Sequence, residues 1–214
     1  MQRTSSILVT NLGHERLNNH MISHEHKCIF IHIPKCAGSS IEKSIVKKDW
    51  WRVNQTTKHM LADKAKKVYN EYWNDYFKFA FVRNPWEVEV SWYFWRLRGW
   101  GCSKRSTRGM SFEDFVIQFD ITAATPWVPN TSLFLDYLTD SSGAVMVDFI
   151  GRVENFQEDF DTVCDKIGIP RQELPHTNKT KHKHYTEYYD DETKEIVAEK
   201  YAQDIEYFGY KFGE

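Results

Sequence analysis

Three short apolar segments, each followed by a segment with helical spacing, constrain the fold of this chain most strongly. They cover residues 28–33, 77–83 and 145–150. Each has the length of a strand, and the first is rich in Ile without clean alternation, which is typical of a strand buried in a parallel sheet. Strands that alternate with helices predict an α/β fold: a single domain with a mostly parallel central sheet flanked by helices.

The segments after the first two strands carry helix start signals. Ser39 stands three residues before Glu42, which is the spacing of a capping box. In the second segment Asn84 can serve as N-cap, Pro85 suits the first helical position and Glu87 completes a box. The sequence therefore predicts a helix directly after each strand, with Gly99 near the end of the second one.

Three further helices are predicted in the second half of the chain, and the first of them, a short one, follows Ser111. Asn155 and Glu158 bracket the start of one, and Gly168 with Pro170 ends it. The last helix is expected over residues 191–208, where apolar residues recur on one side.

The composition describes a folded chain without a strong overall charge. The 214 residues include 8 Trp, 11 Tyr and 14 Phe, and the net charge is only −2. These values predict one packed domain over residues 27–214 after a polar N-terminal arm over residues 1–26, and they argue against nucleic-acid or membrane partners. No apolar run has the length of a membrane span, and the polar start is unlike a signal peptide, so a cytoplasmic protein with reduced cysteines is expected.

Each of the three predicted strands has a cation at its exit. These cations are Lys35, Arg83 and Arg152. Ligands of parallel α/β sheets bind outside the carboxyl ends of the strands. We therefore expect the three cations to face an anionic ligand at that edge of the sheet.

The loop after the first strand, "IPKCAGSS", has the layout of an anion cradle at a helix N-terminus. Backbone N–H groups of residues 36–40 can surround an anion, while Lys35 adds charge and Ser39 and Ser40 add hydroxyl donors. It is not the loop of nucleotide triphosphatases, because Lys35 precedes Gly38 instead of following a glycine. An ordinary turn, with Ser39 as a cap and Lys35 in solvent, explains the same residues equally well.

Arg83 and Ser91 form a second candidate pair, eight residues apart. About 9 Å of helix rise separates Pro85 from Ser91, so an arginine reaching forward and this serine could hold two edges of one phosphate. Taken alone, Ser91 is better explained as a buried serine bonded to a carbonyl one turn back.

Together, these segments resemble the family-2 carbohydrate sulfotransferases. The resemblance rests on "IFIHIPKCAGSSIE", "FKFAFVRNPWEVEVSWY" and "VDFIGRVENFQEDF" in this order, and it extends to the tail, over about residues 28–212. It implies a fold like that of P-loop nucleotide-binding proteins and the sulfuryl donor 3′-phosphoadenosine 5′-phosphosulfate (PAPS), which leaves as adenosine 3′,5′-bisphosphate (PAP).

The resemblance also implies site residues. The residues that would bind the 5′-phosphosulfate are Lys35, Ala37, Gly38, Ser39 and Ser40. Those that would bind the 3′-phosphate are Arg83 and Ser91. Further contacts to the nucleotide would come from Arg152 and from Lys179 in the "NKTK" loop. One departure is Val88, which stands where the family often has a second arginine.

The chemistry expected is in-line transfer of the sulfuryl group to an acceptor hydroxyl. Lys35 would neutralise the charge that grows on the leaving nucleotide. The candidate base is His59, since relatives carry a histidine in a similar stretch and imidazole has a suitable pKa. A surface histidine at a helix start is the competing interpretation, and Glu42 and Glu25 are alternative bases.

The sequence thus predicts a PAPS-dependent sulfotransferase acting on a small-molecule or oligosaccharide acceptor, with no metal. A small-molecule or nucleotide kinase is the rival enzyme, and a non-catalytic PAP- or glycan-binding module is the rival without turnover. The basic run over residues 96–108 suits a sulfated or acidic glycan, or is solvated surface. No oligomeric state is predicted.

Overall fold

The computed structural model describes residues 21–47, 58–98, 109–118, 129, 131, 133–175 and 182–214. The elements in chain order are β1 (Ile22–Ser23), β2 (Cys28–Ile31), α2 (Gly38–Val46), α3 (Ala62–Val68), β3 (Phe77–Val82), α4 (Pro85–Leu97), α5 (Phe112–Gln118), α7 (Phe134–Leu138), β4 (Phe149–Arg152), η2 (Val153–Asn155), α8 (Phe156–Ile167), η3 (Tyr185–Tyr188), α9 (Asp191–Lys200) and α10 (Ala202–Phe208).

One sheet, in the order β1-β2-β3-β4, organises these elements. Strand β2 pairs parallel with β3, and β3 pairs parallel with β4, whereas β1 runs antiparallel to β2. The prediction of a mixed α/β domain around one sheet is confirmed. Because β2, β3 and β4 are parallel, their carboxyl ends lie at the same edge of the sheet, where the loops toward α2 and α4 begin.

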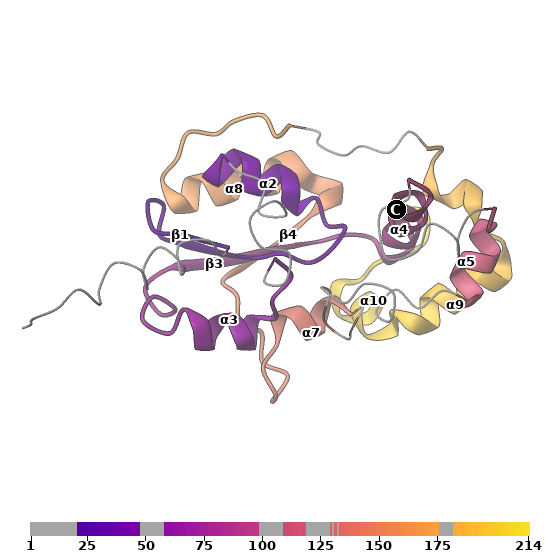
Figure 1. Ribbon diagram of the computed structural model, residues 1–214, viewed down its shortest axis with the longest axis horizontal. Helices are drawn as coiled ribbons and strands as arrows, with labels where there is room; N and C mark the ends of the chain where they lie inside the picture. The colour runs from indigo at the N-terminus through magenta and orange to yellow at the C-terminus, as the bar shows by residue number, and fades with distance from the viewer. Residues whose placement is uncertain are drawn as a thin grey trace, which may run out of the picture.

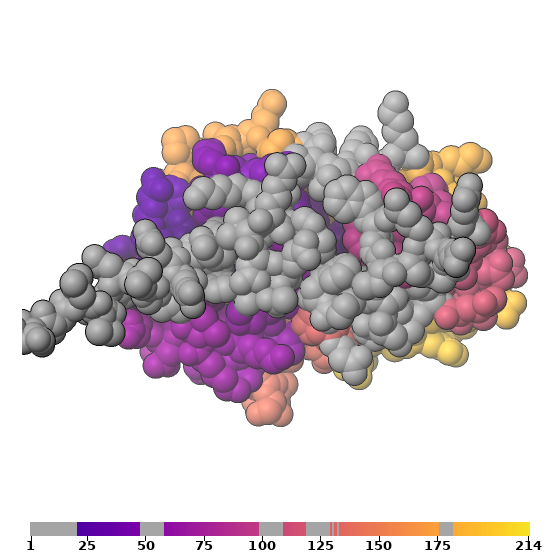
Figure 2. Space-filling view, in the orientation of Figure 1, coloured from indigo at the N-terminus to yellow at the C-terminus, as the bar shows by residue number. Residues whose placement is uncertain are grey.

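Helices cover both faces of the sheet (Figure 1). Helices α2 and α8 lie on one face, α3 and α7 lie on the other, and α4, α5, α9 and α10 form a helical group beside the sheet. On the face shown in Figure 2, the turn that follows α7 projects from the molecule below α3. The chain end returns to the start of α4, where Asn84 Nδ2 donates to the carbonyl oxygen of Glu214 at 3.3 Å.

The core is centred on β2 and β3. The side chains of Ile29, Ile31, Phe79 and Phe81 are fully buried, as expected for strands covered on both faces. Burial of an Ile or Phe side chain contributes about 1.5–3 kcal/mol. These strands therefore hold rigidly the loops that leave their carboxyl ends.

The third strand lies later in the chain than predicted. We expected residues 145–150, but β4 is Phe149–Arg152. The N–H of Met146 donates to the carbonyl of Leu138, so the segment before β4 bonds to the residues after α7. Asp148 then pairs with Lys78 through its backbone N–H and its carboxylate, and the ladder with β3 starts only at Phe149. The first two strands were predicted correctly at their starts, and they end at Ile31 and Val82.

The sheet also begins earlier in the chain than predicted. Ile22 and Ser23 are buried and paired with β2, although they fall in the stretch expected as a polar arm over residues 1–26. A two-residue edge strand is too short for the alternation of a strand to be recognised in the sequence.

The helix starts and ends predicted from the sequence were only partly correct. Asn84 accepts the N–H of Trp86 and Pro85 occupies the first turn, as predicted. Gly168 ends α8 with φ 71°, also as predicted, but Asn155 makes no side-chain capping bond. Gly99 lies outside the described residues.

The last helix, predicted over residues 191–208, is broken into α9 and α10 at Tyr201. The fully buried Tyr201 donates its hydroxyl to Glu89 of α4 at 2.8 Å. This tertiary contact accompanies the break, and a helical repeat in the sequence gives no sign of it.

Candidate functional site

The loop from β2 to α2 is a tight turn with two left-handed residues. Lys35 has φ 65° and Ala37 has φ 57°, a conformation that residues other than glycine rarely adopt. Inside the turn the N–H of Cys36 donates to the carbonyl of Ile33 at 3.4 Å, and the N–H of Ser40 donates to that of Ala37 at 2.9 Å. The loop is closed on itself before α2 begins.

Three N–H groups of this turn have no backbone acceptor within the described part of the chain. They belong to Ala37, Gly38 and Ser39 at the N-terminus of α2. The first N–H groups of a helix lack intrahelical partners and lie at the positive end of its dipole, which favours an anion there. Fewer N–H groups than predicted can therefore bind an anion, because those of Cys36 and Ser40 donate to the carbonyl groups of Ile33 and Ala37.

Gly38 is required by His32, the polar residue that follows β2. A Cβ placed on Gly38 would lie 2.2 Å from Nε2 of the His32 ring. The imidazole thus packs directly on the first turn of α2, in the space that any side chain at position 38 would need.

Glu42 does not form the predicted capping box with Ser39. The residue at the N-cap is Ala37, without a side-chain capping bond. The buried Glu42 carboxylate instead accepts from His32 Nδ1 at 2.6 Å and from Lys58 Nζ at 3.1 Å. A lysine and a histidine donor at these distances outcompete a capping N–H for the same oxygens.

The same contacts make Glu42 a poor general base. Burial acts to raise its pKa, but the charges and hydrogen bonds of His32 and Lys58 outweigh burial and hold the pKa below the usual value. Both carboxylate oxygens are engaged with these partners. Glu25, the other carboxylate considered, is exposed.

His59 is buried, so the interpretation as a surface histidine is wrong. Its side chain lies beside His32, with the ring centroids 4.6 Å apart, and Nδ1 is 2.9 Å from the carbonyl oxygen of His32. A carbonyl only accepts hydrogen bonds, so Nδ1 must carry the proton and Nε2 of the neutral ring keeps its lone pair.

The pKa of His59 lies well below 6.5. Burial is the main cause, and the positive charges of His32, Lys58 and Lys35 act in the same direction. The imidazole is therefore neutral at pH 7, in the tautomer with a free basic Nε2. That is the form that a general base needs.

Lys35 is half-buried and faces two indole rings of α4. Its Nζ lies 5.2 Å from the ring centroid of Trp92 and 5.6 Å from that of Trp95, within the range of cation–π contacts. Burial lowers the pKa of Lys35 to about 7, and the charges of Arg83 and Arg98 add to the effect. Lys35 is thus only partly exposed and packs against α4, unlike the solvated lysine of the ordinary-turn interpretation.

Arg83 joins the two predicted phosphate motifs. Its Nη1 donates to the carbonyl of Lys35 at 3.3 Å, and Nη2 pairs with Glu87 at 2.6 Å. Glu87 therefore bonds to the arginine and not to the backbone of Asn84, so the second predicted capping box is also wrong. Within the described residues, the buried Nε of Arg83 has no acceptor.

Ser91 lies on α4 and is buried. The predicted alternative, a bond from Ser91 to a carbonyl one turn back, is not found among the contacts of the described residues. The Ser91 hydroxyl is thus not committed to the helix backbone, and the role of a ligand donor stays open to it.

The third cation, Arg152, makes other contacts. Its guanidinium donates to the carbonyl of Phe208 and lies 4.9 Å from the ring centroid of Tyr210. The structure does not bring it into contact with the cradle residues. Lys179 and residues 99–108 of the basic run lie outside the described residues.

His32 and Lys58 were not predicted from the sequence as parts of the site. Lys58 Nζ reaches Ser39 Oγ at 3.4 Å as well as Glu42, so it connects the cradle to the segment that carries His59. The available signal was a histidine at the end of an otherwise apolar strand segment. Such a residue needs a buried polar partner.

Within the described ranges, no helix combines the length and apolar character needed to cross a membrane. The same ranges contain no cluster of three or more His, Cys, Asp or Glu residues arranged to hold a metal ion.

Comparison with known proteins places these observations in a family. A family model described as "Sulfotransferase family" matches residues 18–211, which is most of the chain. The chain is also 33% identical over 108 residues to an uncharacterized protein of Archaeoglobus fulgidus, in an alignment that covers 50% of this chain and 79% of the relative.

Proposed function

The chain belongs to the Sulfotransferase family. We propose that it transfers the sulfuryl group of PAPS to a hydroxyl group of a carbohydrate, either a small molecule or an oligosaccharide, and releases PAP. The fold we propose for the nucleotide site resembles that of P-loop proteins, with a parallel strand, a turn and a helix N-terminus facing the anion.

The observation that carries this proposal is the contact between the two phosphate motifs. Arg83 Nη1 donates to the main-chain oxygen of Lys35, so the loop after β2 and the loop after β3 are in contact, which supports a single site built from both. PAPS carries a 5′-phosphosulfate and a 3′-phosphate on one nucleotide. Two adjacent cationic loops at one sheet edge suit such a ligand better than a single phosphate.

The described residues fit this ligand. The N–H groups of Ala37, Gly38 and Ser39 lack backbone acceptors among the described residues, and the buried Arg83 Nε lacks a partner there. Unpaired buried donors cost about 1–3 kcal/mol each, and an anion would relieve that cost. With the Ser39 and Ser40 hydroxyls, the cradle would hold the 5′-phosphosulfate.

The 3′-phosphate is assigned to Arg83 and Ser91. Arg83 offers Nε and, if Glu87 yields, Nη2 on one edge of the guanidinium, which is the fork that phosphate oxygens use. We assign no contact to Arg152, whose guanidinium is already engaged with Phe208 and Tyr210. Lys179 and the consequences of Val88 stay predictions.

Bound PAPS would supply the sulfuryl group and the leaving nucleotide. Lys35 would hold its proton and its charge near the leaving oxygen, because a nearby polyanion raises the pKa that burial lowers to about 7. His59 would take the acceptor proton on Nε2, while its Nδ1–H stays bonded to the His32 carbonyl. Trp92 and Trp95 would fix the path of the lysine side chain.

Nucleotide binding tests the proposal first. PAP should stabilise the protein against heat more than ATP with Mg²⁺ does, since a ligand that binds the native state raises stability. Turnover is then sought with radiolabelled PAPS and a set of glycan and small-molecule acceptors. A larger shift with ATP would support a kinase, and PAP binding without turnover on any acceptor would support a non-catalytic module.

The 3′-phosphate assignment has its own test. Arg83→Ala should weaken PAP binding by about 10- to 100-fold but change the affinity for adenosine 5′-phosphate little, because loss of a charge-assisted contact costs about 1.5–3 kcal/mol. Arg171→Ala is the matched control, since Arg171 is an exposed arginine paired with Asp165. Equal losses for both nucleotides after Arg83→Ala would contradict the assignment.

A further inference from the structure

Glu42 is the centre of a buried cluster that we call the Glu42 cluster: Glu42, His32, Lys58 and His59. Only 2% of Glu42 and 3% of His32 are exposed. Placing a carboxylate in the interior costs several kcal/mol unless partners compensate its charge. An apolar residue at position 42 would be sufficient for helix packing, since Ile41 and Ile45 of the same helix are buried in this way.

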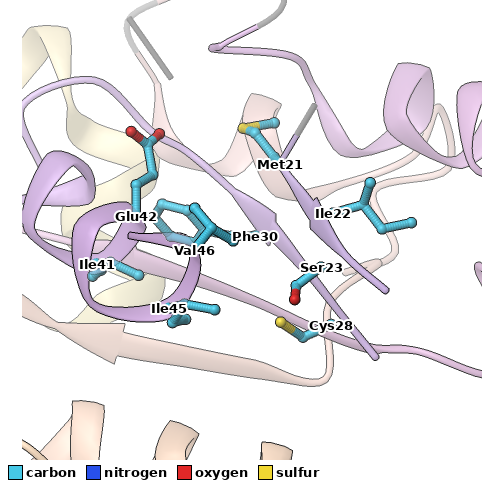
Figure 3. Close-up of a pocket in the computed structure, with 9 residues that line it drawn as sticks. All are labelled: Met21, Ile22, Ser23, Cys28, Phe30, Ile41, Glu42, Ile45 and Val46. Carbon is cyan, nitrogen blue, oxygen red and sulfur yellow. The ribbon is translucent and has the colours of Figure 1, made fainter. Parts of the chain in front are cut away.

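Glu42 is too deeply buried, at 2% exposed, for direct contact with a substrate. Its side chain lines a small cavity together with apolar residues of β1, β2 and α2, and the carboxylate points away from Cys28 and Ile45 (Figure 3). The cavity measures about 20 Å³, which is room for about one water molecule. The carboxylate therefore acts on protein groups.

Among the residues that the structure describes, two chains of contacts lead from Glu42 to His59. In one, Glu42 Oε1 accepts from the His32 ring, and the main-chain oxygen of His32 accepts from His59 Nδ1. In the other, Glu42 Oε2 accepts from Lys58, which precedes His59 in the chain. The carboxylate thus joins α2, the end of β2 and the segment before α3 at the residue proposed as base.

We propose that Glu42 is a positioning residue for His59: it fixes His32 and Lys58 so that the imidazole keeps its Nδ1–H bond to the His32 carbonyl and holds Nε2 ready to accept a proton. This inference rests on the proposed function, because it assigns Glu42 a role in the same transfer reaction. Glu42 supports the base indirectly and touches neither the nucleotide nor the acceptor.

The test is a double-mutant cycle between Glu42→Gln and His59→Ala, measured on kcat for transfer and on the affinity for PAP. Glu42→Gln keeps the size of the side chain and removes its charge. A displacement of a catalytic group by about 1 Å costs on the order of 100-fold in rate. Glu42→Gln should therefore lower kcat by about 10- to 100-fold and change the PAP affinity by less than about 3-fold.

In the His59→Ala background, Glu42→Gln should leave kcat unchanged, because a positioning residue has no effect once the positioned group is gone. Equal losses of kcat in both backgrounds would overturn the inference. Imidazole ¹⁵N shifts give a second readout: His59 should be the Nδ1–H tautomer in the wild type and a mixture of tautomers in Glu42→Gln.

Glu89→Gln is the matched control. Glu89 is an equally buried glutamate on α4 that accepts from Lys200 at 2.7 Å and from Tyr201, and both of these partners are residues outside the Glu42 cluster. It should lower thermal stability without a selective loss of kcat. If Glu42→Gln does not fold, Lys58→Met replaces it in the same cycle, since it removes one of the two contact chains and keeps the bond between Glu42 and His32.

The outcomes separate this inference from the proposed function. Absence of PAP binding and of transfer in the wild type would reject the proposed function itself. Unchanged kcat in His59→Ala would reject the base and, with it, this inference. A large loss in His59→Ala, combined with an independent loss in Glu42→Gln, would reject the positioning role alone.

Discussion

Gly38→Ala should destabilise the protein far more than a glycine-to-alanine change in a helix normally does. At an ordinary helical position alanine is more stable than glycine by about 0.5–1 kcal/mol. Here the added Cβ would lie 2.2 Å from Nε2 of His32, and the two ring carbons next to Nε2 are at 2.3 and 2.6 Å. The imidazole must move, and it is only 3% exposed.

The magnitude follows from what holds that ring. Overpacking a tight site costs about 1–3 kcal/mol. Moving His32 also weakens its 2.6 Å bond to Glu42, and hydrogen bonds to charged groups contribute about 1.5–3 kcal/mol. After the gain in helix propensity is subtracted, Gly38→Ala should cost about 2–5 kcal/mol of the free energy of unfolding.

Urea unfolding, followed by circular dichroism, measures this cost by linear extrapolation. The decisive comparison is the same change in a His32→Ala background, where the space of the ring is free. There Gly38→Ala should be neutral or stabilising by up to about 1 kcal/mol. A similar destabilisation in both backgrounds would refute the contact, and the need for glycine at position 38 would then have another origin.

Three further results are expected. PAP affinity should fall about tenfold per pH unit above pH 7, because Lys35, whose pKa is about 7, must take up a proton to bind the anion. In calorimetric titrations the variant Lys35→Arg should show a flatter dependence of PAP affinity on pH. The acid limb of the pH profile of kcat/KM should lie below pH 6.5, because burial and neighbouring cations lower the pKa of His59, and it should disappear in His59→Ala. An acid limb that persists in the variant would reject His59 as the general base. Asp204→Ala should lower the free energy of unfolding by about 2–4 kcal/mol, because the N–H groups of Phe134 and Leu135 at the start of α7 lose their acceptor. In the same urea assay, Asp204→Asn should recover part of this loss.

The parallel strands and the positions of Lys35 and Arg83 just after two of them were predictable, because both depend on local pattern, whereas the contacts of Arg152 were not. A run such as residues 77–82 is apolar at almost every position, and a strand covered on both faces requires that. The late start of β4 was not predictable, since residues 145–150 are equally strand-like. Only the backbone bonds from Met146 to Leu138 and from Asp148 to Lys78 show where the ladder begins.

The two predicted capping boxes show why site chemistry is harder to predict than the fold. A glutamate three residues after a serine or asparagine can reach back to the N-cap, and this bond is worth about 1 kcal/mol. Near a buried cation the same carboxylate gains more from the ion pair. Glu42 pairs with His32 and Lys58, and Glu87 pairs with Arg83.

These two exceptions to local pattern occur at the two positions proposed to surround the ligand. Glu87 holds the arginine assigned to the 3′-phosphate, and the Glu42 cluster holds the histidine assigned to the acceptor. A helix that only had to be stable would keep its glutamates at the cap, where they cost nothing in desolvation. Glu42 is buried and Glu87 is half-buried, and both are paired with basic side chains. These pairs indicate that the first turns of α2 and α4 serve to hold charged groups in place, at some expense in helix stability.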